Sequence, residues 1–140
     1  MKNFDKLSGW LYSEGYDLRW GKSCWVDEEN SQVNINPNLT GLNLIYTILH
    51  ECGHVKLFSY DTYEEEFKSI ARVDDGDRRH TNSLLYRYKK IKEEIDAWEE
   101  GYNIALELSI KINKDKYDKY AAKWVYTYMV QLSTPHPSIW

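Results

Sequence analysis

Residues 41–58 read GLNLIYTILHECGHVKLF and are the most informative stretch of the chain. The apolar residues that fill its first half predict a helix that is buried in the protein. Three polar side chains follow within one turn: His50, Glu51 and His54. Burying two histidines and a glutamate is costly unless they are paired or bound to a ligand. What these three residues do is therefore central to what the protein does.

The spacing of the two histidines favours metal binding. Residues four apart lie on one face of a helix, so His50 and His54 can place two imidazole nitrogens on one ion, usually zinc. Glu51 is offset by about 100° and can reach a metal-bound water. The metal lowers the pKa of that water, Glu51 takes its proton, and the hydroxide attacks a carbonyl. The alternative is three polar residues on a half-exposed face, hydrogen-bonded to neighbours.

A third metal ligand is expected from a later helix. Leu57 stands where the longer HExxHxxGxxH form has glycine, so that form is absent. Residues 90–108, KIKEEIDAWEEGYNIALEL, have helical periodicity, and Glu94 lies on the stripe that packs inward. Glu93 and Asp96 fall off the centre of this stripe. They are better suited to accept a hydrogen bond from the N–H of a metal-binding histidine without binding the metal themselves, or to act as alternative ligands.

Other assignments for these residues remain open. Glu94 could instead be a surface charge or pair with Arg87. His80, in a polar segment, could be the third ligand, could stabilise the oxyanion, or could be solvated. Tyr60, Tyr63 and Tyr88 are further candidates to stabilise the oxyanion, and the sequence does not rank them.

The rest of the chain predicts an α+β fold. We expect a single domain over residues 1–140, with an N-terminal helix, a small antiparallel sheet, the HExxH helix, a long helix carrying the third ligand and a C-terminal helix. The predicted helices span about 4–14, 41–58, 80–110 and 115–132, and the tail over 131–140 is expected to be irregular. One face of the last helix carries Tyr117, Tyr120, Ala121, Trp124, Val125, Tyr128 and Met129. Gly53, Ala97 and Gly101 are small and permit close helix packing.

The last predicted strand is a candidate substrate-binding element. It covers residues 32–36, where Val33 and Ile35 alternate with polar residues. If it forms a sheet edge beside the metal, the backbone of Val33, Asn34 and Ile35 can pair with an extended peptide. The alternative is an ordinary strand whose polar face is wet.

Composition limits the class of protein. The 140 residues are 42% hydrophobic and 29% charged, with a net charge of -4. This is typical of a globular chain and argues against nonspecific nucleic-acid binding. No apolar run approaches the roughly 20 residues of a membrane helix, and the N-terminus does not resemble a signal peptide, so the expected compartment is the cytoplasm. The two cysteines, Cys24 and Cys52, are expected to be reduced.

HECGH, followed about forty residues later by EEIDAWEEG, resembles the minimal gluzincin-type zinc metallopeptidases. The plan is similar to the ImmA/IrrE-like family and to small metallopeptidases of phages and bacteria. Over residues 30–108 the resemblance implies that His50 and His54 are ligands, Glu51 is the base and Glu94 is the acidic ligand. DAW stands where that family typically has an EAN-like triplet. The SprT-like group, which uses a third histidine, matches only through His80.

Three functions are therefore considered. The first is a zinc peptidase that binds one zinc per chain and cleaves a protein or peptide substrate in the cytoplasm. If the chain is phage-encoded, this is the cytoplasm of the host. The second is a non-catalytic binding or structural protein with a zincin-like fold, such as a virion component, whose metal site is structural or vestigial. The third is a helical interaction module without metal. The intact Glu51 favours the first, because a structural site needs no base.

Overall fold

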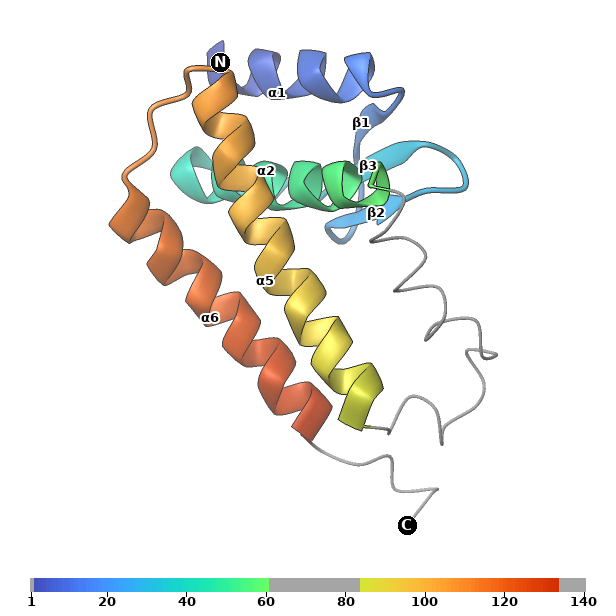
Figure 1. Cartoon of the computed structure of the whole chain (residues 1–140). Coiled ribbons are helices and arrows are strands. Elements are labelled where there is room, and N and C mark those ends of the chain that lie inside the picture. Colours follow the sequence, from blue (N-terminus) through green and yellow to red (C-terminus); the bar gives the residue numbers. More distant parts are fainter. Residues whose placement is uncertain (1, 61–83, 134–140) are drawn as a thin grey trace.

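The computed structural model describes residues 2–60 and 84–133 and has the predicted α+β composition (Figure 1). The helices are α1 (Lys2–Ser13), α2 (Gly41–Phe58), α5 (Leu84–Glu107) and α6 (Lys114–Ser133). The strands are β1 (Asp17–Trp20), β2 (Trp25–Asp27) and β3 (Gln32–Ile35). The expectation of an irregular tail from residue 131 is wrong at its start, because α6 continues to Ser133.

Helix α2 lies at the centre of the fold. It contacts α1, strands β2 and β3, and both long helices, as its position in Figure 1 indicates. Its side chains Ile48, Leu49 and Cys52 have no exposed surface. A helix that is apolar around much of its circumference is stable only when it is surrounded, which accounts for this position. The core around it also takes Leu7 and Leu11 from α1.

The sheet is mixed, so the prediction of an antiparallel sheet is wrong. Its strand order is β1-β3-β2, with β3 parallel to β1 and antiparallel to β2. Strand β3 takes the central position because Val33 and Ile35, its two apolar residues, are fully buried there. In a simple three-strand meander the central strand would instead be β2, whose Trp25 is 49% exposed. Register places Val33 opposite both Leu18 and Val26.

Helices α2 and α5 cross at a glycine contact. A Cβ atom on Gly53 would overlap the backbone carbonyl of Ala97, and one on Gly101 would overlap the carbonyl of Leu49. The two backbones therefore approach more closely than side chains would allow at these points. The small residues expected to permit close packing do so, and the crossing brings the polar turn of α2 against Glu93 and Glu94 of α5.

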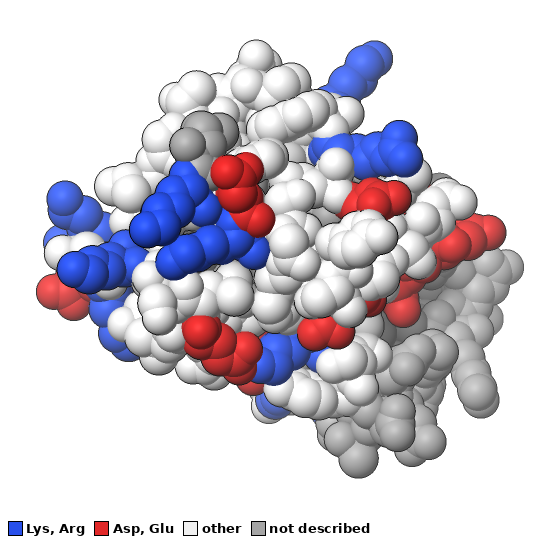
Figure 2. All heavy atoms as spheres, turned by 90° about the horizontal axis from the view of Figure 1, so that it is seen from above, with Lys and Arg blue, Asp and Glu red and all other residues white. Residues whose placement is uncertain are grey.

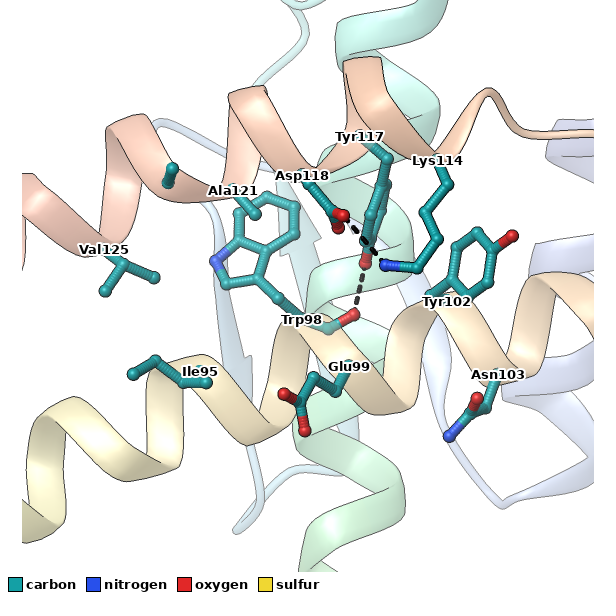
Figure 3. A pocket seen from close by; sticks show the side chains of 11 residues that line it. Ile95, Trp98, Glu99, Tyr102, Asn103, Lys114, Tyr117, Asp118, Ala121 and Val125 are labelled. Carbon is teal, nitrogen blue, oxygen red and sulfur yellow. Dashed lines mark hydrogen bonds and ion pairs between the residues drawn. The ribbon is translucent and has the colours of Figure 1, made fainter.

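Helix α6 runs beside α5 (Figure 1) and is joined to it by a buried hydrogen bond. The hydroxyl of Tyr117 donates to the carbonyl of Trp98 at 2.6 Å, and Figure 3 shows this bond at the wall of an open hollow between the helices. The hollow has a volume of about 600 Å³. Lys114 pairs with Asp118 at 2.8 Å on its rim.

Two surface properties follow from the described residues. Acidic and basic side chains both occur between broad uncharged areas on the face in Figure 2, so this face is not a continuous basic surface. Among the described helices, none combines the length and the apolar character needed to cross a bilayer. Cys24 and Cys52 are both free thiols, as expected.

Candidate metal centre

His50 and His54 lie one turn apart on α2 and point to the same place. Their Nε2 atoms are 3.1 Å apart, and the two rings are nearly edge to face at 4.6 Å between centroids. Both side chains are largely buried, with 11% and 12% of their surface exposed. Helical spacing alone explains the shared direction.

Glu94 of α5 completes the cluster. Its Oε2 is 2.8 Å from His54 Nε2, and its Oε1 is 3.4 Å from His50 Nε2. Ligand atoms of His50, His54 and Glu94 all lie within 4.8 Å of one another, so the three residues could hold a metal ion. The close crossing of α2 and α5 makes this possible, because a wider separation would leave Glu94 out of reach.

The spacing and chemistry of these atoms fit a metal. Two nitrogens bound tetrahedrally at about 2.1 Å from zinc would be about 3.4 Å apart, close to the observed separation of the Nε2 atoms. Among the described residues, Glu94 Oε1 is the one buried side-chain nitrogen or oxygen without a hydrogen-bond partner. An unpaired buried acceptor is costly, and a cation at the centre of the cluster would satisfy it.

The two other acidic residues considered on α5 lie differently. Glu93 Oε1 is 3.5 Å from His54 Nδ1, on the side of the ring away from the cluster, where a carboxylate can fix the orientation of the imidazole. Asp96 pairs instead with Lys92 on its own helix at 2.8 Å and is not part of the cluster. Asp96 is therefore outside the group of described residues that could hold a metal ion, because its carboxylate is directed to Lys92.

Glu51 is buried beside the cluster without joining it. Only 4% of the residue is exposed, and its Oε1 is 3.3 Å from Nδ1 of His50. It also lines two hollows that meet at the cluster. Its position next to the ligands is consistent with proton transfer at the cluster and also with support of His50.

Electrostatics hold the metal-free cluster together as ion pairs. Burial by itself lowers the pKa of His54, but the carboxylates of Glu93 and Glu94 outweigh it and raise the pKa to about 10. Burial likewise opposes the positive charge of His50, and the carboxylates of Glu51 and Glu94 outweigh it, so its pKa is raised. Burial raises the pKa of Glu94, but the two imidazoles reverse this and lower it. The negative charge of Glu94 is therefore already in place to receive a cation.

Trp98 fixes the ring of His50. The two rings are stacked, with centroids 4.2 Å apart and planes 10° from parallel. Trp98 is 5% exposed and lies one turn after Glu94 on α5. The same helix therefore supplies a carboxylate to the cluster and the surface against which the ring of His50 rests.

Two hollows flank the cluster, and both include His50, Glu51, Cys24 and Tyr128 in their walls. The first, here called the aromatic hollow, has a volume of about 340 Å³. The second, the acidic hollow, has a volume of about 290 Å³. The remaining walls of the aromatic hollow are formed by Lys22, Ser23, Asn36, Leu39, Thr47, Trp98, Tyr120 and Trp124. The acidic hollow also takes in His54, Glu93 and Glu94.

Tyr128 is a site residue that the sequence did not identify as one. Burial, followed by the charges of Glu94 and Glu51, raises the pKa of its hydroxyl, which interacts with Glu94. Tyr128 lies on the apolar stripe of α6, so its packing against the protein could be predicted from the sequence. The stripe does not show which of its rings contacts a residue of another helix, such as Glu94. Tyr60 and Tyr88, considered for the oxyanion, are exposed and line neither hollow.

The expected substrate strand is in the wrong place. Strand β3 lies between β1 and β2, so both of its edges are paired, and Val33 and Ile35 are fully buried. Neither these residues nor Asn34 can offer a free backbone edge to a peptide. Strand β2 is at the edge of the sheet instead, and its Trp25 and Val26 line the acidic hollow. His80 and Tyr63 lie outside the described residues.

No family model, curated protein or solved structure matches the chain.

Proposed function

We propose that this protein is a zinc-dependent metallopeptidase. The observation that carries the proposal is the convergence of His50 Nε2, His54 Nε2 and the Glu94 carboxylate, one oxygen of which is buried without a hydrogen-bond partner. Glu51 lies beside them, at the junction of two hollows. Two histidines and a glutamate with a second carboxylate beside them are the residue types that metal-assisted hydrolysis uses.

Zinc is the proposed ion because the donor set has two imidazoles and one carboxylate, which leaves a fourth coordination position for a small molecule. Zinc held here would polarise a substrate carbonyl and lower the pKa of a water molecule. In the proposed reaction Glu51 accepts the proton of the attacking water and passes it to the leaving amine. Its Oε1 is 3.3 Å from Nδ1 of His50, so it lies beside one of the proposed ligands.

Two further groups would act on the substrate. Tyr128 is the candidate to donate a hydrogen bond to the developing oxyanion, since its hydroxyl stays protonated and it borders both hollows. The edge strand β2 is the candidate to pair with the backbone of an extended peptide. It replaces β3 in this role because β2 lies at the edge of the sheet that the described residues form and also contacts the acidic hollow.

One observation favours a second candidate, a non-catalytic protein with a structural metal site. Glu51 Oε1 lies 3.3 Å from His50 Nδ1, the position of a carboxylate that orients a metal-bound histidine. A residue confined to that role would support the site without transferring protons. The protein would then be a binding or structural component, such as one of a virion.

The test uses Glu51→Gln and a matched control, Glu99→Gln, which makes the same chemical change at an exposed position of α5. Wild type and both variants should each bind about one zinc per chain. Cleavage of a peptide library, followed by mass spectrometry, should be abolished in Glu51→Gln and retained in Glu99→Gln. A wild-type chain that takes up no zinc would overturn both candidates. Zinc uptake with cleavage unaffected by Glu51→Gln would exclude the proposed role of Glu51.

A further inference from the structure

The aromatic hollow opens directly onto the proposed reaction centre. His50 and Glu51 form part of its wall, so a group that fills it lies next to the bond that would be cleaved. The hollow is therefore placed to select among substrates rather than to bind an unrelated ligand.

One wall of the hollow is a ladder of edge-to-face rings. Trp98 meets Tyr120 at 5.9 Å between centroids and 80° between planes, and Tyr120 meets Trp124 at 6.2 Å and 69°. Such arrangements bring the positive edge of one ring to the negative face of the next. A further ring in the hollow would meet ring edges and faces of the same kind.

The one hydroxyl of the ladder is already engaged. The hydroxyl of Tyr120 lies 3.2 Å from the hydroxyl of Thr47 and shares a hydrogen bond with it. Among the described residues of the wall, Lys22 is the one charged side chain apart from His50 and Glu51, and it is exposed. The interior therefore offers ring and aliphatic surface, completed by Leu39, and few free donors or acceptors.

The volume suits one large side chain. About 340 Å³ is near the lower limit of small-molecule pockets, and it exceeds what a methyl or isopropyl group would fill. The rim carries Trp124, which is 42% exposed, and Tyr128, which is 38% exposed. These two partly exposed rings would lose solvent contact when the hollow is occupied, which adds to the favourable burial.

We propose that the aromatic hollow binds an aromatic side chain of the substrate next to the bond that is cleaved. The inference rests on the proposed function, because it takes the cluster of His50, His54 and Glu94 as the place where a substrate carbonyl binds. It adds the substrate class, which is peptides with Phe, Tyr or Trp adjacent to the cleaved bond.

The test uses small hydroxamates, which bind zinc directly and differ only in the attached group. Acetohydroxamate reports on the metal alone. The hydroxamates of 3-phenylpropanoic acid and 3-cyclohexylpropanoic acid each add a six-membered ring of similar size. The phenyl ring is flat and aromatic, and the cyclohexyl ring is saturated. Calorimetry with the zinc-loaded full chain should show that the phenyl compound binds about 10-fold or more tightly than acetohydroxamate. It should also bind more tightly than the cyclohexyl compound, because only a flat ring extends the ladder.

Variants locate the effect. Trp124→Ala removes one wall, and Ser23→Trp adds a large side chain at another residue that lines the hollow. Each should abolish most of the gain from the phenyl group while leaving acetohydroxamate affinity unchanged, which also shows that the variant is folded. Tyr126→Ala is the control, because Tyr126 is 66% exposed on the same helix and outside the hollow.

The outcomes separate the two proposals. No binding of acetohydroxamate to the zinc-loaded chain would overturn the proposed metal centre, and the inference with it. Binding of acetohydroxamate without a gain from phenyl, or with a larger gain from cyclohexyl, would overturn the inference alone. So would a phenyl gain that survives both Trp124→Ala and Ser23→Trp.

Discussion

The crossing of α2 and α5 gives the sharpest prediction, which concerns Gly53→Ala. In an isolated helix this change should stabilise the helical state by about 1 kcal/mol, because alanine has the higher helix propensity. In the folded protein the new Cβ would lie within 3.0 Å of the backbone carbonyl of Ala97, closer than real Cβ atoms come to other atoms. Helix propensity therefore predicts that Gly53→Ala stabilises the protein, whereas tertiary packing predicts that it destabilises the protein.

The magnitude follows from what must move. The obstructing atoms belong to the backbone of α5, so no flexible side chain can give way and the helices must separate, by on the order of 1 Å. Overpacking of a close-packed core costs about 3 kcal/mol at the upper end of its usual range. After the gain in helix propensity, the free energy of unfolding should fall by about 2 kcal/mol. Metal ligands tolerate about 0.2 Å, so the separation of Glu94 from the histidines should also weaken zinc binding.

Two measurements check this. Urea unfolding in the presence of a chelator, followed by tryptophan fluorescence, gives the stability of the metal-free chain. Competition with a zinc indicator gives the affinity. Gly9→Ala is the matched control, since Gly9 lies within α1 and a Cβ there meets nothing within 4 Å. It should raise stability by about 0.5–1 kcal/mol and leave zinc affinity unchanged. Gly53→Ala with wild-type stability and zinc affinity would refute the close crossing.

Three other predictions test the centre and its support. Glu94→Ala should reduce zinc affinity by much more than 100-fold, whereas Asp96→Ala should leave it within about 3-fold in the same competition assay; equal losses would argue against Glu94 as a ligand. Since the pKa of His54 is raised to about 10 and zinc binds neutral imidazole, binding at pH 7 should release about one proton or more, and zinc affinity should rise with pH up to that value. Calorimetry in buffers of different ionisation enthalpy measures this release, and its absence would contradict the ion-paired metal-free state. Tyr117→Phe removes a buried hydrogen bond and should lower stability by about 1 kcal/mol, against almost no change for the exposed Tyr126→Phe; urea unfolding in which the two variants behave alike would refute this role of Tyr117.

Local periodicity accounts for the features that were predicted from sequence. The apolar run before His50 predicted the bounds of α2, and helical spacing alone directs His50 and His54 to one point. The inward stripe of the 90–108 segment placed Glu94 on the packing face, where it is 5% exposed. These features depend on residues within a few turns of one another, so the sequence carries them directly.

The features that were missed depend on contacts between distant segments. Strand β3 is central rather than at an edge, and its Val33 and Ile35 are fully buried there, but local alternation does not determine the order of strands in a sheet. Tyr128 reached the centre only because α6 folds back along α5.

The sequence by itself therefore determined the helices, the pair of histidines and the inward-facing carboxylate. The tertiary structure alone decided that the carboxylate meets the histidines, which strand has a free edge and which rings form the hollow. The physical reason is the separation in sequence of the residues that determine each feature. A helical turn is determined by residues that are neighbours in the chain. The approach of α5 to α2 depends instead on the absence of a Cβ at Gly53 and Gly101, where backbones that are distant in sequence come into contact.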